Sequence, residues 1–381
     1  MALPLALAAS LFLALAPPAP APLGAPLSGA PSAPAPVGAP APPERLHTPA
    51  ANPAAYAQAR DLAARGEVVL AQGVLSMART PQAEWLTGQS PARAERDARR
   101  VVLDAARRRA VPVLVLYNVP GRDCASYSGG GAATSAQYRD WIDAVARGIG
   151  RERALVVLEP DGLALLPDEC GVPDPGGART AARYAELNHA VDRLEPLPGT
   201  RVYLDAGHAA WHEVRNIAPR LRKAGIARAR GFALNVSNYQ TDAANSRYGE
   251  LISSCLAHIG RGGTPGTCPL DKAPRGTVPF VTDSSRNGRG PWAPPAGRYK
   301  DPQDWCNPPG RGLGARPTLG TGEPLHDARL WIKTPGESDG PCLRGAPGPG
   351  DPARGTVDPP AGTWFPQQAL ELVRRARPAI A

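Results

Sequence analysis

The chain has 381 residues, of which 43% are hydrophobic and 20% are charged, and its formal net charge is +9. This composition allows a sizeable core within one large domain or two ordinary ones. The positive charge lies largely on arginines of helix-like segments such as 92–109, where acidic and apolar residues are interleaved. Because no nucleic-acid-binding motif accompanies these arginines, we interpret them as a solvated surface and expect no nucleic-acid partner.

The N-terminal segment predicts export of the protein. Residues 1–22 contain one apolar stretch that is too short to span a bilayer and fits a signal peptide, although no basic residues precede it. Residues 23–45 are dominated by Pro, Ala and Gly and cannot form a core, so we interpret them as a linker. A single folded domain is expected over residues 46–381, with no membrane-spanning segment and no membrane partner.

The remaining chain alternates between strand-like and helix-like patterns. Amphipathic patterns at 135–150 and 179–194 predict helices. Apolar strand-like runs occur at 67–74, 111–117, 154–160, 201–207, 231–237, 277–283 and 328–333. Runs that are apolar on both faces and separated by helices indicate parallel βα units. About seven such units favour a distorted α/β barrel over an open doubly wound sheet, and no GxGxxG motif supports a nucleotide-binding sheet.

Polar residues follow these predicted strands at their C-terminal ends, which is the face that carries the active site in α/β barrels. They are Tyr117, Arg122, Asp123, Glu159, Asp161, Asp205, His208, Asn235, Asn238, Asp283, Lys333, Glu337 and Asp339. A ring of carboxylates at one mouth has three possible uses. It could bind a hard metal ion, perform two-carboxylate acid/base chemistry as in glycosidases, or form structural ion pairs with arginines.

Three tryptophans favour the second use. Trp85, Trp211 and Trp305 each lie beside polar residues of expected loops rather than inside apolar strands. One such tryptophan is most often a core residue, but three of them in loops offer flat aromatic faces on which sugar rings can stack.

The motifs between residues 70 and 365 resemble glycoside hydrolase family 6, the inverting β-1,4-glucanases of cellulose breakdown. The order and the spacing of eight stretches both agree with that family. These stretches are MARTPQAEW (77–85), LYNVPGRDC (116–124), VVLEPDGLALL (156–166), YLDAGHAAW (203–211), NVSNY (235–239), VTDSSRNGRGP (281–291), DWCNPPGRGLG (304–314) and LWIKTPGESDG (330–340).

The resemblance implies a role for each carboxylate at a cleft over the C-terminal face of the barrel. Asp161 would be the general acid, and Asp123 would raise the pKa of that acid, because two carboxylates at close range cannot both ionise cheaply. Asp339 matches the proposed base, which acts directly or through a water chain. Asp205 matches a supporting carboxylate, and Tyr117 matches the tyrosine that crowds the distorted sugar.

The same resemblance implies the residues that bind substrate. Trp85, Trp211 and Trp305 would be sugar platforms. His208, Asn235, Lys333 and Glu337 would contact hydroxyl groups, Arg122 would orient Asp123, and Ser128 would lie on a flexible lid. Glu159 is expected to be structural, pointing to the same side as Asp161 but deeper in the barrel, with Pro160 ending the strand.

Six cysteines behind a signal-like leader predict disulfides in an oxidising compartment. The sequence alone allows 15 pairings, and the absence of CxxC argues against a zinc cluster. The family resemblance implies the pairs Cys124–Cys170 and Cys306–Cys342, which leaves Cys255 and Cys268 for each other.

Three features favour an endo-acting enzyme over a tunnel-forming one. They are the very short segment 339–342, the compact RDC loop, and Val214 at a position where tunnel-forming relatives often carry tryptophan. We therefore expect a secreted, monomeric endo-β-1,4-glucanase that acts on soluble or amorphous β-1,4-glucan without a metal or another cofactor. The alternatives are an exo-acting cellobiohydrolase of the same family, a non-catalytic glycan-binding protein, and a metal-dependent deacetylase or hydrolase.

Overall fold

The structure, a computed structural model, describes residues 44–50, 52–171, 178–271 and 276–380. The predicted signal peptide and nearly all of the predicted linker lie outside these residues. No helix of the described part is long and apolar enough to cross a membrane.

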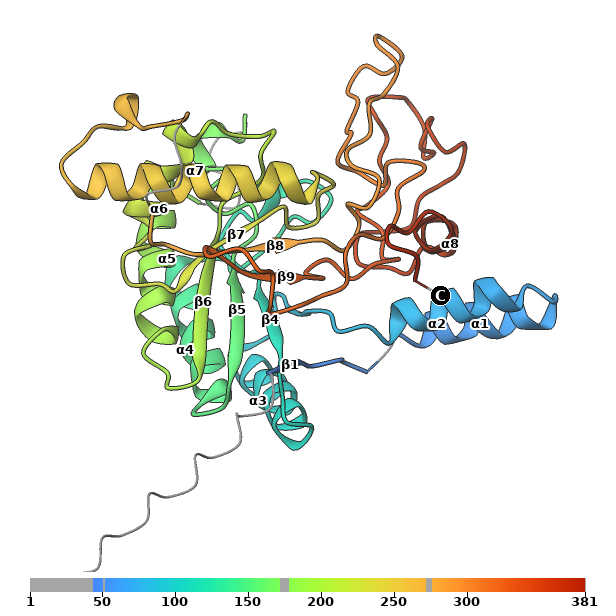
Figure 1. The fold of residues 1–381 in the computed structure, drawn as a ribbon, viewed down its shortest axis with the longest axis horizontal. Coiled ribbons are helices and arrows are strands. Elements are labelled where there is room, and N and C mark those ends of the chain that lie inside the picture. The colour runs from blue at the N-terminus through green and yellow to red at the C-terminus, as the bar shows by residue number, and fades with distance from the viewer. Residues whose placement is uncertain (1–43, 51, 172–177, 272–275, 381) are drawn as a thin grey trace, which may run out of the picture. The chain divides into compact units, whose positions relative to one another are not determined.

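A curled sheet of seven parallel strands forms the centre of the fold (Figure 1). In spatial order the strands are β2 (Glu84–Leu86), β4 (Val113–Leu116), β5 (Ala154–Leu158), β6 (Thr200–Asp205), β7 (Gly231–Leu234), β8 (Phe280–Asp283) and β9 (His326–Leu330). The two edge strands, β2 and β9, approach each other at their ends: the amide of Ala83, just before β2, donates to the carbonyl of Trp331, just after β9, at 2.9 Å. The Trp85 indole also donates to the Ile332 carbonyl at 2.9 Å. The distorted α/β barrel is therefore confirmed.

Helices cover the outside of the sheet and one side of the molecule. The helices are α1 (Pro53–Ala64), α2 (Val68–Ala78), α3 (Pro91–Arg107), α4 (Ser135–Ile149), α5 (Thr180–Leu194), α6 (Val214–Lys223), α7 (Asp242–Gly260) and α8 (Pro366–Arg374). Helices α3 to α7 pack against the outer sheet face, while α1, α2 and α8 form a separate cluster. A short second sheet pairs β1 (Arg45–Leu46) with β3 (Ala110–Val111).

Alternation along the strands divides the core into two layers. In β4, Leu114 and Leu116 face the helices, whereas Val113 and Val115 fill the barrel interior. Both layers are apolar because each face of a parallel sheet is covered. This continuous apolar character is what made strands β4 to β8 visible in the sequence.

Local signals fix the ends of the helices. The Thr134 side chain accepts from the Gln137 amide at the start of α4, and Gly150 adopts a φ of 61° at its end. The Thr241 side chain likewise accepts from the Ala244 amide at the start of α7. These caps satisfy backbone groups that have no partner within the helix.

Two predictions about the N-terminal part were wrong. Residues 67–74 were expected to form a strand, but they belong to α2, whose buried positions Ala71, Val74, Met77 and Ala78 follow a helical period. The seventh strand is β2, which has only three residues. Trp85 therefore lies in a strand and not in the expected loop.

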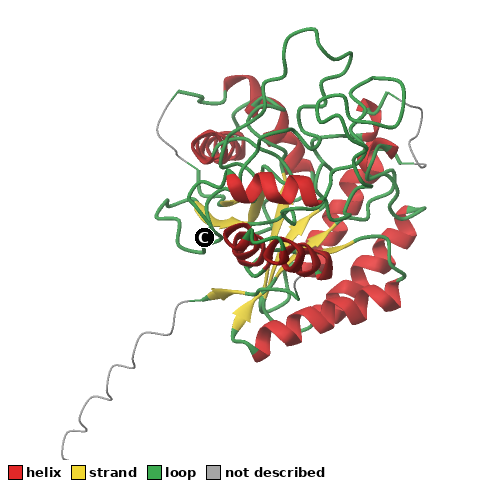
Figure 2. Ribbon diagram, turned by 90° about the vertical axis from the view of Figure 1, so that its right-hand side faces the viewer, coloured by secondary structure: helices red, strands yellow, loops and turns green. Residues whose placement is uncertain are grey.

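The segment 284–365 contains little regular structure apart from β9, and Figure 2 shows how much of the loop structure lies above the strands. Arginines satisfy the carbonyl groups that a sheet would otherwise satisfy. Arg344, which is 1% exposed, donates to the carbonyls of Pro302, Gln303 and Cys306. Arg354 donates to the Asn307 carbonyl at 2.7 Å.

Candidate active site

A cleft of about 1260 Å³ lies at the C-terminal ends of the strands. Asn238 lines this cleft together with twelve of the residues to which the sequence analysis assigned a role. These are Trp85, Tyr117, Arg122, Asp123, Ser128, Asp161, His208, Trp211, Trp305, Lys333, Glu337 and Asp339. Three of the predicted tryptophans and four of the predicted carboxylates thus line one groove, an arrangement that suits a polysaccharide substrate.

Asp161 reaches this cleft through a tight turn after β5. Glu159 and Asp161 have φ values of 51° and 65°, a region that side-chain-bearing residues seldom adopt. A Cβ atom at Gly162 would lie 2.9 Å from the Glu159 carbonyl oxygen, so glycine is needed there. The turn ends the strand and aims the Asp161 side chain into the cleft.

The surroundings of Asp161 favour its protonated form. Burial raises the pKa of this carboxyl group well above its usual range, and the charges of Asp205 and Asp123 raise it further, whereas a hydrogen bond from Tyr117 lowers it. Burial also raises the pKa of Asp205 to about 7. The Asp205 Oδ2 atom accepts from the Asp161 amide at 3.0 Å and from the Gly207 amide at 3.1 Å. The raised pKa suits Asp161 to act as a proton donor.

Asp123 lies on a strained turn beside Asp161. Asp123, Cys124 and Ala125 have φ values of 55°, 47° and 62°, and Asp123 Oδ2 accepts from the Ser128 amide at 2.7 Å. Burial raises the pKa of Asp123, although the Ser128 amide and the Arg122 charge oppose this. Three left-handed residues in succession persist only where the surrounding structure holds them.

Arg122 organises this turn mainly through backbone atoms. Its guanidinium group donates to the carbonyls of Tyr117 at 2.6 Å, Ser128 at 2.8 Å and Gly129 at 3.2 Å. It also lies 4.5 Å from the centre of the Tyr117 ring. The expected orientation of Asp123 by Arg122 therefore takes an indirect form, through the loop that presents the Ser128 amide.

Asp339 is held in its ionised form. Arg286 Nη1 donates to both of its carboxylate oxygens, at 3.0 and 2.8 Å, and Lys333 Nζ lies 3.4 Å away. Oδ2 also accepts from the Asn307 amide at 2.9 Å and from the Tyr239 hydroxyl at 3.3 Å. Burial raises the pKa of Asp339, but the charges of Arg286 and Lys333 outweigh this, so the pKa is lowered.

The aromatic side chains offer exposed ring faces along the cleft. Trp211 and Trp305 are 38% and 39% exposed, which is unusual for tryptophan in a folded domain. Trp85 is half-buried and lies edge-on to Tyr117, with ring centres 5.5 Å apart. The His208 ring lies 5.5 Å from that of Trp211, and burial lowers the pKa of His208 to about 4, so this histidine is neutral.

Glu337 and Lys333 also lie in the cleft. Glu337 Oε1 accepts from the Asn52 side chain at 3.4 Å, and burial raises the pKa of Glu337. Lys333 Nζ donates to the Ser338 carbonyl at 3.0 Å. Both side chains line the cleft and retain capacity to contact a ligand.

Two predicted site residues do not line the cleft. Asp205 is 2% exposed and lies beneath Asp161, as its supporting role requires. Asn235 is fully buried, and its amide group donates to the Asp283 carbonyl at 2.7 Å and accepts from the Gln240 amide at 3.0 Å. Its position does not support direct contact with a sugar hydroxyl.

Glu159 points away from the barrel interior, which corrects the expectation from strand alternation. Its positive φ turns the carboxyl group toward the helices, where Tyr138 of α4 and Arg183 of α5 interact with it. Burial raises its pKa to about 7.

Sequence reasoning also missed Arg286 and Arg183. Arg286 lies in one of the matched stretches, just after β8, but nothing separates it from other arginines until its partner 53 residues away is known.

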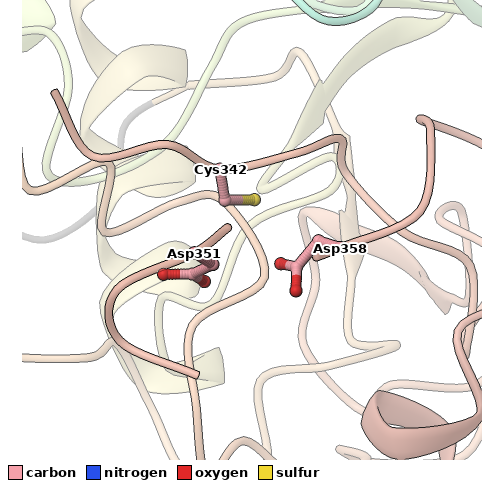
Figure 3. Close-up of side chains that lie close together, drawn as sticks. All are labelled: Cys342, Asp351 and Asp358. Atoms are coloured by element: carbon pink, nitrogen blue, oxygen red, sulfur yellow. The ribbon is translucent and has the colours of Figure 1, made fainter. Parts of the chain in front are cut away.

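Cys342, Asp351 and Asp358 lie close together, as ligands of a metal ion would (Figure 3). Cys342, however, forms a disulfide with Cys306 and offers no thiolate. Both oxygens of Asp351 accept from Arg344, at 2.7 and 3.0 Å. This group is therefore a structural ion-paired cluster.

The described cysteines form the three expected disulfides, Cys124–Cys170, Cys255–Cys268 and Cys306–Cys342. The first ties the Asp123 turn to the segment that follows Asp161. The third ties the loop of Trp305 to the segment that follows Asp339. Two of the three bridges thus fix loops of the cleft.

Comparison with known families decides the assignment. The family model described as glycosyl hydrolases family 6 matches residues 43–376. The chain belongs to this family. Among curated family 6 relatives, Endoglucanase A of Cellulomonas fimi is 40% identical over 302 residues, covering 79% of this chain and 56% of the relative. The chain thus spans about half the length of that relative. The 1,4-beta-D-glucan cellobiohydrolase C of Emericella nidulans is 34% identical over 293 residues, covering 70% and 61% of the two chains.

A solved family 6 structure shares the fold. The endoglucanase Cel6 from Mycobacterium tuberculosis, solved in complex with methyl-cellobiosyl-4-deoxy-4-thio-β-D-cellobioside, is 39% identical with a TM-score of 0.70. The match covers 87% of this chain and 97% of that one. The resemblance inferred from the eight motifs is therefore confirmed at the level of family and fold.

Proposed function

We propose that this chain is a secreted glycosidase that cleaves internal β-1,4-glucosidic bonds with inversion of configuration. One arrangement carries the proposal: burial and the charges of Asp205 and Asp123 raise the pKa of Asp161 well above its usual range, inside a cleft lined by Trp85, Trp211 and Trp305. A carboxylic acid that stays neutral near pH 7 is the proton donor that glycoside cleavage requires.

In the proposed reaction, Asp161 gives its proton to the glycosidic oxygen as the bond to the anomeric carbon breaks. A water attacks that carbon from the opposite face and loses a proton. Among Asp123, Asp161, Glu337 and Asp339, only Asp339 has a lowered pKa, so it is suited to receive that proton. Since both of its oxygens already accept hydrogen bonds, we propose that the proton arrives through an intervening water. A spacing of about 6.5–9.5 Å between acid and base leaves room for the attacking water.

The remaining cleft residues would bind the glucan. Trp85, Trp211 and Trp305 would stack on sugar rings, and His208, Lys333 and Glu337 would contact hydroxyl groups. Tyr117 would crowd the sugar at the cleaved bond, and Ser128 would act from the loop beside Asp123. Asn235 would support the end of β7 from below.

Endo-cleavage is favoured by three observations. The relatives compared above include enzymes named endoglucanase, in Cellulomonas fimi and Mycobacterium tuberculosis. The segment from Asp339 to Cys342 is short, and the Cys306–Cys342 bridge ties it down. The exposed faces of Trp211 and Trp305 agree with an open groove. The second candidate, exo-cleavage, draws on the relative named cellobiohydrolase in Emericella nidulans.

We further propose that residues 1–22 are a signal peptide, that 23–45 are a linker and that 46–381 form the catalytic domain of a monomer. Three disulfides fit an oxidising compartment. N-terminal sequencing of the exported protein would locate the processing site, and a mature protein beginning at Met1 would contradict the assignment.

One assay separates the candidate functions. Viscosity loss and reducing-end release would be followed on carboxymethyl cellulose, with and without a chelator, for the wild type and Asp161→Ala. We expect viscosity to fall early, no effect of the chelator, and at least about 100-fold lower activity in Asp161→Ala on substrates with poor leaving groups. Slow viscosity loss would indicate exo-cleavage, loss of activity with chelator would indicate a metal enzyme, and full activity of Asp161→Ala would refute the acid assignment.

A further inference from the structure

The turns that carry Asp123 and Asp161 are joined from behind, on the side away from the cleft. Two buried side chains make the connection: Glu159, which is 1% exposed, and Arg183 of α5, which is 2% exposed. Neither lines the cleft. Any effect they have on the reaction must therefore pass through the residues that they hold.

Arg183 bonds to both turns with one planar group. Nη1 donates to the Gly162 carbonyl at 2.9 Å, and Nη2 donates to the Pro120 carbonyl at 2.7 Å. Gly162 directly follows Asp161, and Pro120 lies three residues before Asp123. The fixed angle of a guanidinium group thus sets the separation of the two carbonyls, which a lysine could not do because it presents a single point charge.

Glu159 makes the complementary connection. It belongs to the Asp161 turn, and its Oε2 accepts from the amides of Asn118 and Val119, at 2.8 and 3.0 Å. These amides begin the loop that leads to Asp123. Glu159 therefore holds the N–H groups of that loop, while Arg183 holds a carbonyl of the same loop two residues later.

The titratable groups around this pair come from several elements. Tyr138 of α4 interacts with Glu159, and Glu186 of α5 lies 3.6 Å from Arg183 Nε. Tyr117, at the end of β4, is influenced by the charge of Glu159. A buried arrangement of this kind contributes little net stability compared with apolar packing, so its presence calls for another role.

We propose that Glu159 and Arg183, here called the turn clamp, are positioning residues that fix Asp123 relative to Asp161 and so maintain the protonation of the acid. This inference rests on the proposed function of Asp161. Like-charge repulsion raises the pKa of the acid only while the two carboxylates stay close. A looser clamp would let them separate, and the acid would lose its proton at lower pH.

The activity test compares Arg183→Met with Arg220→Met. Arg220 of α6 is a matched control, because it donates to the Leu163 carbonyl at 3.0 Å and to Glu169 but not to the loop of Asp123. We expect Arg183→Met to lower kcat about 10- to 100-fold on unactivated cello-oligosaccharides with little change in KM. The alkaline limb of its pH profile should move to lower pH. A dinitrophenyl cellobioside, which needs little proton donation, should lose much less activity.

Conservative variants distinguish positioning from general loss of packing. Glu159→Gln keeps a carbonyl oxygen for the two amides and should retain most of the wild-type pH profile. Glu159→Ala removes that acceptor and should behave like Arg183→Met. All rates are measured well below the unfolding midpoint of each variant. If Glu159→Ala and Arg183→Met keep the wild-type pH profile, or change no more than Arg220→Met, the clamp has no role in positioning.

Amide hydrogen exchange tests the clamp without any activity. Arg183→Met should increase exchange in segments 118–131 and 159–166 together, whereas Arg220→Met should affect only the second. Exchange that rises in one segment alone would overturn the coupling of the two turns. An inactive wild type with coupled exchange would instead contradict the proposed function and leave the structural connection standing.

Discussion

Removing the Cys124–Cys170 disulfide should cost this protein activity as well as stability. The bridge is anchored in the middle of the left-handed turn Asp123–Ala125. The variant Cys124→Ala/Cys170→Ala leaves no unpaired thiol. The matched control is Cys255→Ala/Cys268→Ala, because that bridge joins α7 to a loop outside the cleft.

The stability loss can be worked from the size of each closed loop. The bridges span sequence separations of 46 and 13 residues. Restriction of the unfolded chain then predicts losses of about 4 and about 3 kcal/mol. An unfolding entropy of about 2.1 cal/mol/K per residue over the 44–381 unit converts these losses to falls in Tm of roughly 6 and 4 °C.

The loss of activity follows from the strain in the turn. Left-handed backbone costs about 1–2 kcal/mol for each residue other than glycine, so three residues store about 3 kcal/mol or more. If the turn relaxes without its bridge, the competent position of Asp123 becomes less populated. Since about 1.4 kcal/mol corresponds to a tenfold change, kcat/KM should fall by up to about 100-fold.

The assay pairs calorimetric unfolding with initial rates on cello-oligosaccharides at a temperature where all proteins are folded. The Cys255→Ala/Cys268→Ala control should lose stability and keep wild-type kcat/KM. Wild-type kcat/KM in Cys124→Ala/Cys170→Ala would refute the reasoning, because it would show that the strained turn keeps its shape without the bridge.

Two further predictions concern charge. Asp205→Asn removes a negative charge that raises the pKa of Asp161, so the acid should lose its proton at lower pH and the alkaline limb of the kcat/KM profile should move to lower pH. An unchanged limb would show that the charge of Asp205 does not contribute to this pKa. Arg286→Met leaves Asp339 buried without its two hydrogen bonds from Arg286, and the free energy of unfolding measured with urea should fall by about 3–5 kcal/mol. The same change at Arg228, whose ion pair with Asp192 is exposed, should cost less than about 1 kcal/mol, and equal losses in the two variants would contradict this difference.

The central fold could be predicted because its signals are local and strong. Runs such as 154–158 are apolar on both faces, which is typical of a parallel strand that is covered on both sides. The segment 67–74 was wrongly predicted as a strand because its apolar residues are dense enough to fit the period of a strand or of a helix. Packing against α8 selects the helix. Strand β2 was missed because three residues carry no periodic signal, and the polar neighbours of Trp85 made it seem a loop residue.

The site was predictable to the extent that its residues lie in short motifs. Asp161 and Asp123 could be named from EPD and RDC, but the direction of Glu159 could not. Alternation along a strand predicts an inward side chain, and the positive φ that reverses it leaves no mark in the sequence. Arg183 was equally hidden, since its bonds to Pro120 and Gly162 join positions 63 and 21 residues away.

Some of the arginines behind the net charge of +9 are not surface residues but donate hydrogen bonds to loop carbonyls. Arg344 and Arg354 hold together a segment that has few backbone hydrogen bonds of the kind found in a sheet. A guanidinium group keeps its proton at every pH at which proteins remain folded. Acidification or mild alkalinity would thus leave these arginine hydrogen bonds intact while the carboxylates of the cleft change their protonation, so the loop segment that Arg344 and Arg354 hold should keep its conformation over the pH range in which activity changes.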